Sequence, residues 1–182
     1  MIVDQAGRSR TCVFCASSEL PAPLHALARS LGAAIAATGD DLVYGGTTTG
    51  LMGAVSGGAR DAGGRVVGYV PQTMVASWLV DDALDQLVVV ATMGERKDQM
   101  LAGTHRVVVL PGGLGTLDEL FEVMTYRQLG YVPAEVDIVL LDPDDLYAPL
   151  LAQLDALIAL GTVQPVSAAL RVARTVAEAL AG

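Results

Sequence analysis

The stretch Arg106-Val-Val-Val-Leu-Pro-Gly-Gly-Leu-Gly-Thr-Leu-Asp-Glu-Leu120 runs from an apolar segment through a glycine-rich turn into a helical pattern. Its apolar part does not alternate with polar residues, and neither does the run from Leu87 to Ala91. This is typical of strands buried on both faces. The same succession of strand and helix recurs along the chain. Strands are expected at 11–16, 41–44, 65–70, 86–91, 106–110 and 136–141, helices at 22–38, 50–62, 93–104, 116–130 and 145–160, and a further strand and helix after 168. The pattern predicts a doubly wound, mainly parallel α/β sheet with helices on both faces.

Length and composition favour a single domain. The chain has 182 residues, of which 52% are hydrophobic and 17% charged, so it can bury a substantial core. No linker or repeat divides it, and one domain is expected over 1–182, with 1–10 flexible. No apolar run approaches the roughly 18 residues of a membrane span, and residues 1–10 lack the apolar segment of a secretory signal. We therefore expect a cytoplasmic protein without a membrane segment.

The charge balance argues against nucleic acid as a partner. Eleven Lys and Arg stand against twenty Asp and Glu, for a net charge of −9. Binding to a phosphate backbone depends on clustered cations, and this chain has no such cluster. An anionic ligand would have to be held locally, by loop amides and one or two cations.

The two cysteines form a C-x-x-C inside a predicted strand, Thr11-Cys-Val-Phe-Cys-Ala16. Residues three apart on a strand point to opposite faces and cannot form a disulfide. Two cysteines also cannot complete a zinc site, and His25 and His105 are poor candidates for the remaining ligands. We expect Cys12 and Cys15 to be buried core residues and expect no metal site.

Two predicted strands end in glycine-rich turns that open helices, Tyr44-Gly-Gly-Thr-Thr-Thr-Gly-Leu-Met-Gly53 and Leu110-Pro-Gly-Gly-Leu-Gly-Thr-Leu-Asp-Glu119. Glycine lets backbone amides approach an anion, and the following helix N-terminus adds a favourable dipole. Together the turns indicate a nucleotide or sugar phosphate. Neither matches the P-loop or the G-x-G-x-x-G fingerprint, so ATP hydrolysis and NAD binding are disfavoured.

Charged residues beside these turns have two interpretations each. Thr116 to Glu119 reads T-x-x-E, a helix capping box, yet Glu119 could equally be a catalytic carboxylate. Arg96 and Lys97 begin a helix just after strand 86–91, where they could form an exposed helix face or a site for an anion. A carboxylate and an arginine beside a nucleotide suit cleavage at the anomeric carbon, because that transition state is oxocarbenium-like. Glu122 could be a second carboxylate or simply solvated.

Met93-Gly-Glu-Arg-Lys97 and Pro111-Gly-Gly-Leu-Gly-Thr-Leu-Asp-Glu119 resemble the LOG family, the cytokinin riboside 5′-monophosphate phosphoribohydrolases. The resemblance extends to 12–18, 42–46, 50–55 and 128–130. It implies a Rossmann-like fold and a homodimer with active sites near the dimer interface. It also implies hydrolysis of a nucleoside 5′-monophosphate to free base and ribose 5-phosphate, without a metal or organic cofactor.

The family's functional residues carry over to matching positions of this chain. Arg96 and Glu119 correspond to the catalytic pair. Nucleotide contacts correspond to Lys97, Gly113, Leu114, Gly115, Thr116, Leu117, Asp118 and Thr125, and in the earlier loops to Ser17, Gly45 and Gly46. Ser17 and Ser18 could instead cap the next helix. Tyr126 and Arg127 are expected to line the base pocket.

Several positions depart from the family pattern. Thr47 replaces a third glycine, Gly94 replaces a histidine, and Tyr131-Val-Pro-Ala-Glu135 stands where Lys-Pro is usual. Ser77-Trp78 occupies the place of an Arg-Glu pair whose glutamate contacts the nucleotide. The hypothesis is that the reaction class is kept while the preferred base is not necessarily a prenylated adenine. Trp78 could stack on a base, or it could pack in the core or in a dimer interface.

Three other functions are alternatives to an N-glycosidase. The family has been described as possible lysine decarboxylases, but pyridoxal phosphate needs a Schiff-base lysine and the one lysine, Lys97, lies in a nucleotide motif. A non-catalytic carrier of a nucleotide or of molybdenum cofactor would not need the Arg96–Glu119 pair. A structural dimer in which Thr116 and Glu119 only cap a helix leaves the position of Arg96 and Lys97 unexplained.

Overall fold

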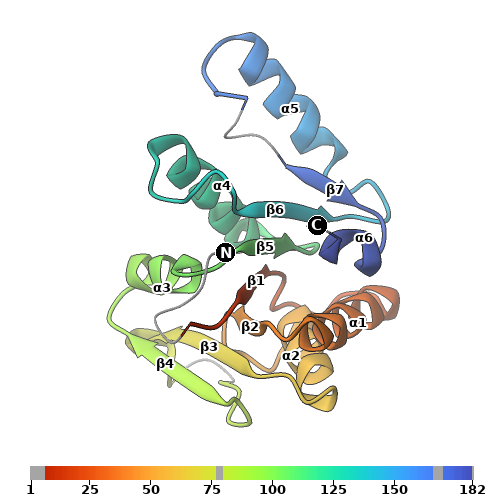
Figure 1. The fold of residues 1–182 in the computed structure, drawn as a ribbon, viewed down its shortest axis with the longest axis vertical. Helices are drawn as coiled ribbons and strands as arrows, with labels where there is room; N and C mark the ends of the chain where they lie inside the picture. The colour runs from red at the N-terminus through yellow and green to blue at the C-terminus, as the bar shows by residue number, and fades with distance from the viewer. Residues whose placement is uncertain (1–6, 77–79, 166–169, 182) are drawn as a thin grey trace.

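A seven-stranded parallel sheet runs through the middle of the molecule in the order β4-β3-β2-β1-β5-β6-β7 (Figure 1). The computed structural model describes residues 7–76, 80–165 and 170–181. The strands are β1 (Arg10–Phe14), β2 (Asp41–Tyr44), β3 (Val66–Pro71), β4 (Gln86–Val90), β5 (Arg106–Val109), β6 (Asp137–Leu141) and β7 (Arg171–Ala173). The helices are α1 (Ala22–Thr38), α2 (Gly50–Asp61), α3 (Met93–Leu101), α4 (Leu114–Leu129), α5 (Ala148–Ala159) and α6 (Val176–Leu180), with a short 3₁₀ turn at Gln72–Met74. The predicted α/β class with a parallel sheet is confirmed.

The element boundaries differ from the predictions by up to three residues, at helix ends as well as starts. Helix α3 ends at Leu101 and not at 104. Helix α4 begins at Leu114, two residues before the predicted start, with Gly113 as its N-cap. Helix α5 begins at Ala148 and not at 145, because the carboxylate of Asp142 first accepts hydrogen bonds from the backbone N–H groups of Leu146 and Tyr147. Strand β1 begins at Arg10, at the edge of the segment predicted to be flexible.

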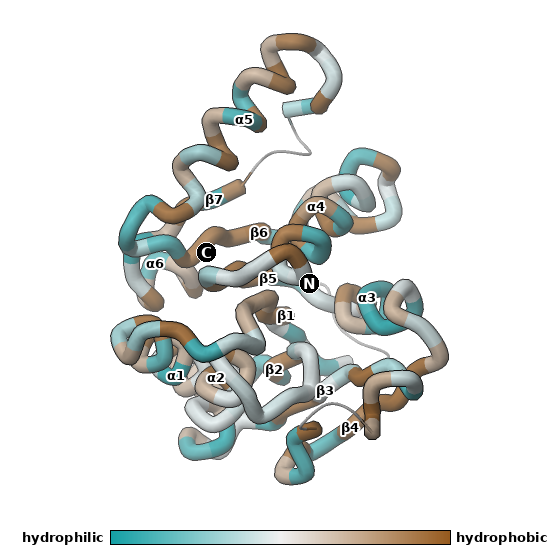
Figure 2. Tube along the Cα trace, turned by 180° about the vertical axis from the view of Figure 1, so that it is seen from behind, coloured by the Kyte–Doolittle hydropathy of each residue, from teal (hydrophilic) through white to brown (hydrophobic). Residues whose placement is uncertain are grey.

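The helices cover the sheet from both sides (Figure 1). On one face α1, α2 and α6 pack against Val13, Val108 and other side chains of the strands. On the other face α3, α4 and α5 pack against the intervening residues, among them Phe14 and Val109. Figure 2 shows hydrophobic residues concentrated along the central strands and also on α5, which projects from one end of the molecule. No helix within the described part of the chain is long and apolar enough to cross a membrane.

The two cysteines lie where the strand pattern predicts. Both are buried and unpaired, with Cys12 in the core beneath α3–α5 and Cys15 in the core beneath α1, α2 and α6. Burial raises the pKa of both thiols, so neither is a reactive thiolate.

One prediction about the strands is wrong. The run of β4 was expected to be buried on both faces, yet Leu87 and Val89 are 40% and 44% exposed. The reason is topological: β4 is the first strand of the sheet, so it has one neighbour and incomplete helix cover. The inner strand β5 is fully buried, as predicted.

The order of the strands determines where a ligand can bind. The chain builds outward from β1 in one direction through β2, β3 and β4, and then returns to place β5 on the other side of β1. The carboxyl ends of β1 and β5 therefore border the crevice at which doubly wound sheets bind ligands. The loops after these two strands are joined by a hydrogen bond from Ala16 N–H to the Pro111 carbonyl, 3.2 Å.

Candidate active site

A pocket of about 310 Å³ opens at the carboxyl ends of β1 and β5. The loop after β1 supplies one wall, and the glycine-rich turn and first turns of α4 supply the opposite wall. One residue of α2 and two of α3 complete it. The lining residues are Cys15, Ala16, Ser17, Ser18, Met52, Met93, Arg96, Gly113, Leu114, Gly115, Thr116, Asp118 and Glu119.

Arg96 is buried in this pocket, and hydrogen bonds to Tyr69 and Glu119 orient it. It lies in the first turn of α3 and is only 2% exposed. Its Nε donates to the Tyr69 carbonyl at 2.9 Å, and its Nη1 donates to Glu119 Oε1 at 2.8 Å. A charged side chain is rarely buried unless it is paired, and here the pairing sets the orientation of the guanidinium as well.

Gly45 makes room for this guanidinium. A Cβ at Gly45 would lie 2.5 Å from Arg96 Nη2 and 2.8 Å from Met52 Sδ, closer than van der Waals contact allows. Gly46 has a different role, since its φ of 81° requires glycine and a Cβ there would meet Val70. Neither glycine lines the pocket. The first glycine loop therefore acts on the site indirectly, by leaving room for the Arg96 guanidinium.

Glu119 is the carboxylate partner of Arg96. It is 6% exposed, and its burial raises the pKa of the carboxyl above the usual range, although the Arg96 charge and hydrogen bond oppose that rise. The capping interpretation of Thr116 and Glu119 is wrong, because α4 starts at Leu114 and has no side-chain cap.

The T-x-x-E pair that does cap a helix lies in α3, where Thr92 Oγ1 accepts from Glu95 N–H at 3.1 Å. The Glu95 carboxylate in turn accepts from Ala91 N–H at 2.8 Å. This cap holds the first turn of α3, and Arg96 is the next residue along the helix.

Lys97 sits beside the pocket and neutralises its acidic rim. Its ammonium pairs with Asp118 at 2.9 Å and with Glu122 at 3.0 Å, so Glu122 is not simply solvated. Burial lowers the pKa of Lys97, but the hydrogen bonds and charges of Asp118 and Glu122 outweigh it and raise the pKa overall. A lysine held protonated in this way is a poor Schiff-base nucleophile, so the residues present do not fit pyridoxal phosphate.

The N-terminus of α4 offers an anion site. The backbone N–H groups of its first turn have no partner within the helix and carry the positive end of the dipole. Gly113 and Gly115 are exposed, and a Cβ on either would meet nothing within 4 Å, so the backbone is accessible there. The first turn contains no acidic residue.

Most of the predicted contact residues meet at this pocket, and a few do not. Ser17 and Ser18 line it, and neither caps α1, whose N-cap is Pro21 without a side-chain bond. The side chain of Leu117 packs against the core. Thr125 faces away, into a groove between α4 and α5, and donates to the Phe121 carbonyl. Trp78 and its neighbour Ser77 lie outside the described residues.

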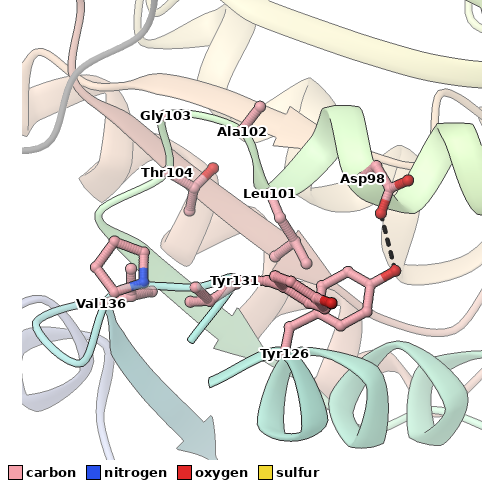
Figure 3. A pocket seen from close by; sticks show the side chains of 10 residues that line it. Asp98, Leu101, Ala102, Gly103, Thr104, Tyr126, Tyr131 and Val136 are labelled. Atoms are coloured by element: carbon pink, nitrogen blue, oxygen red, sulfur yellow. Dashed lines mark hydrogen bonds between the residues drawn. The ribbon is translucent and has the colours of Figure 1, made fainter. Parts of the chain in front are cut away.

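Tyr126 and Arg127 also lie away from the site. Tyr126 lines a larger cavity of about 480 Å³ and donates to Asp98 at 2.9 Å (Figure 3). That cavity is bordered by Thr104 and Val136, which precede β5 and β6, so it lies at the amino edge of the sheet. Arg127 is buried and donates to the Val136 carbonyl. Contrary to expectation, neither residue lines the pocket of its own copy, because α4 carries both to the opposite edge of the sheet.

Sequence reasoning missed three features of the site. Met52 and Met93 line the pocket, but nothing in the sequence distinguishes them from other apolar helix residues. The Tyr69 carbonyl that accepts from Arg96 is a backbone group, so no residue type in the sequence identifies it. The capping pair Thr92 and Glu95 could have been found, since it follows the same T-x-x-E rule as the pair that was considered.

The topology and the pocket first define a class: a Rossmann-like α/β protein with a buried Arg–Glu pair beside a glycine-rich helix start. The family model described as "Possible lysine decarboxylase" matches residues 52–181. A cytokinin riboside 5′-monophosphate phosphoribohydrolase of Mycobacterium tuberculosis is 42% identical over 163 residues, covering 90% of this chain and 86% of that protein. One of Mycobacterium marinum is 46% identical over 140 residues, covering 77% and 74%. The chain belongs to this family, the LOG family, and is a homologue of curated phosphoribohydrolase enzymes.

Solved structures show the same fold. The molybdenum cofactor carrier protein of Chlamydomonas reinhardtii superimposes with a TM-score of 0.71 at 24% identity, covering 95% of this chain and 93% of that one. At this level of identity the likeness concerns the fold alone.

Proposed function

We propose that the protein hydrolyses the N-glycosidic bond of a purine nucleoside 5′-monophosphate, AMP or an N6-prenyl-AMP, releasing the base and ribose 5-phosphate. The observation that carries the proposal is the buried ion pair of Arg96 and Glu119, joined at 2.8 Å and open to the pocket. Relatives at 42% and 46% identity are named cytokinin riboside 5′-monophosphate phosphoribohydrolases, which supports the substrate class.

The 5′-phosphate would bind at the N-terminus of α4, on the amides of the Gly113–Thr116 turn. Glu119 lies five residues after Leu114, about 7.5 Å further along the helix axis. That separation suits a nucleotide whose phosphate binds the first turn while its ribose C1′ faces the carboxylate. Cys15, Met52 and Met93 offer an apolar, sulfur-rich surface for the purine.

In the proposed reaction the bond between C1′ and the base nitrogen breaks, and its electron pair leaves with the base. Positive charge develops on C1′ and the ring oxygen, and the Glu119 carboxylate stabilises it. A water molecule adds to C1′ and loses its proton, and the departing base gains one. Arg96 keeps Glu119 ionised and oriented within a buried site, where an unpaired carboxyl would become neutral.

We further propose a homodimer formed through the stripe of α4 that contains Phe121, Thr125 and Leu129. These residues are four apart and share one helix face, and Phe121 and Leu129 are exposed apolar side chains. Thr125 lies eleven residues beyond Leu114, about 16 Å along the helix, too far to contact a nucleotide in its own pocket. If Thr125 contacts the nucleotide, as the resemblance implies, it does so in the pocket of a second copy. The proposed location is the cytoplasm, where nucleoside monophosphates are made and used.

A product assay tests the proposed function. Purified protein is incubated separately with AMP, N6-isopentenyl-AMP, GMP and CMP, and free base, nucleoside, ribose 5-phosphate and inorganic phosphate are separated by chromatography. We expect base and ribose 5-phosphate from a purine nucleotide. Nucleoside and inorganic phosphate would instead indicate a phosphatase. Tight binding without any product would favour a nucleotide carrier.

A further inference from the structure

Tyr147, the residue before α5, lies directly behind the turn that would hold the phosphate. Its side chain is buried, and its hydroxyl donates to the Leu110 carbonyl at 2.7 Å. That carbonyl directly precedes Pro111, at the point where β5 leaves the sheet and the glycine-rich turn begins. The phenol therefore anchors the start of the turn.

The tyrosine is itself held in place. Asp142, a buried residue at the end of β6, accepts hydrogen bonds from Leu146 N–H at 2.9 Å and from Tyr147 N–H at 2.8 Å. Burial and the nearby Asp142 charge raise the pKa of Tyr147, so the hydroxyl stays protonated and remains a donor. A rigid chain of contacts thus runs from β6 through Asp142 and Tyr147 to the turn.

Thr116 packs against the middle of the turn. A Cβ on Gly112 would lie 2.1 Å from Thr116 Oγ1, so the threonine side chain occupies the space that glycine leaves free. The turn is therefore anchored at its start by the Tyr147 hydroxyl and packed at Gly112 by Thr116. Amide groups that bind an anion are effective only when they point at it without rearrangement.

We propose that Tyr147 is a positioning residue, whose hydroxyl fixes the Pro111–Thr116 turn in the shape that binds the 5′-phosphate of the substrate. This inference rests on the proposed function for its ligand, and on the hydrogen bond of the hydroxyl to the Leu110 carbonyl for its mechanism. Tyr147 lies outside the lining of the pocket and touches no reacting atom. Its effect is expected on phosphate affinity more than on the chemical step.

The test compares Tyr147→Phe with Tyr44→Phe. Each variant removes one buried hydroxyl and keeps the ring, but the Tyr44 hydroxyl donates to Asp81 and not to the turn. For Tyr147→Phe we expect the KM of AMP and the Ki of ribose 5-phosphate to rise about tenfold, the change that corresponds to one buried hydrogen bond. We expect kcat to stay within about twofold, and Tyr44→Phe to keep both constants. Unchanged constants in Tyr147→Phe, or an equal rise in Tyr44→Phe, would overturn the proposal.

Amide hydrogen exchange measured by NMR gives a second readout that needs no substrate. If the Tyr147 hydroxyl holds the turn, Tyr147→Phe speeds exchange of the Gly112 amide at least about tenfold, while Tyr44→Phe leaves it unchanged. An unchanged exchange rate in Tyr147→Phe would contradict the proposed role of Tyr147. If the unaltered protein hydrolyses and binds no nucleotide, the proposed function fails, while the exchange rates still decide whether Tyr147 holds the turn.

Discussion

Glu119 titrates inside an ion pair, so the pH dependence of turnover reports directly on its surroundings. The proposed reaction needs the carboxylate, and burial raises its pKa. Activity is therefore lost as the pH falls through this raised pKa, and the acid limb of kcat/KM lies at a higher pH than an ordinary glutamate would give.

Two neighbours of Glu119 should shift the acid limb of the kcat/KM profile in opposite directions along the pH scale. The Lys97 charge lowers the pKa of Glu119 and the Asp118 charge raises it. Lys97→Met is therefore expected to shift the acid limb to higher pH, and Asp118→Asn to lower pH. The measurement is kcat/KM against pH for the three proteins. Shifts of the same sign, or none, would show that a group other than Glu119 controls the limb.

At the scale of elements, Asp81 joins α2 to the loop before β4. Its carboxylate accepts from Tyr44 at 3.0 Å, Ser56 at 2.9 Å and Arg60 at 2.8 Å. Asp81→Asn is expected to lower the free energy of unfolding by about 1–3 kcal/mol, because buried donors lose a charged acceptor. Asp82→Asn, an exposed neighbour, is the control and should change it by less than about 0.5 kcal/mol.

The effect of Asp81 should itself depend on pH. Burial raises the pKa of Asp81, but the hydrogen bonds and the Arg60 charge outweigh it and hold the pKa below the usual range. Its stabilisation is therefore complete above the ordinary carboxyl pKa and is lost as the pH falls through the lowered one. Urea unfolding of both variants at neutral and acid pH checks this. A difference between them that stays constant into strong acid would contradict it.

At the scale of the whole molecule, the proposed dimer places the α4 stripe against a second copy. Phe121→Glu puts a charge in the middle of that stripe and is expected to weaken the dimer at least tenfold, about 1.4 kcal/mol or more. Leu87→Glu is the control, because Leu87 is an equally exposed apolar residue on the edge strand β4. Sedimentation velocity distinguishes the states. A Phe121→Glu protein that remains dimeric would exclude this interface.

The inner strands of the sheet are predicted well from the sequence, because each is a short, continuous apolar run without a competing helical pattern. The prediction failed at β4, since Leu87 and Val89 look like Val107 and Val109, and only the strand order reveals which run lies at the edge. The opposite faces of Cys12 and Cys15 followed from strand geometry alone, and the structure bears this out.

The candidate site was predictable where it depends on local motifs. The Arg96 and Glu119 motifs lie 23 residues apart and meet because both follow strand ends. The directions of Thr125 and Tyr126 were not predictable, because a helix of 16 residues carries its last turns to the far edge of the sheet. The acceptor for Arg96 on Tyr69 is a backbone carbonyl, which any residue would supply.

The most direct test compares turnover and binding in the unaltered protein and in Glu119→Gln, with AMP or whichever nucleotide is hydrolysed fastest. Calorimetry gives the nucleotide affinity and chromatography gives the rate of base release. We predict that Glu119→Gln lowers kcat by about 10²–10³-fold while binding stays within about threefold. Arg96→Ala should lose both, because it removes a buried cation from the pocket, and Glu135→Gln on an exposed loop should lose neither. Base release by Glu119→Gln at the rate of the unaltered protein would contradict the account, since Glu119 would then have no part in the chemistry.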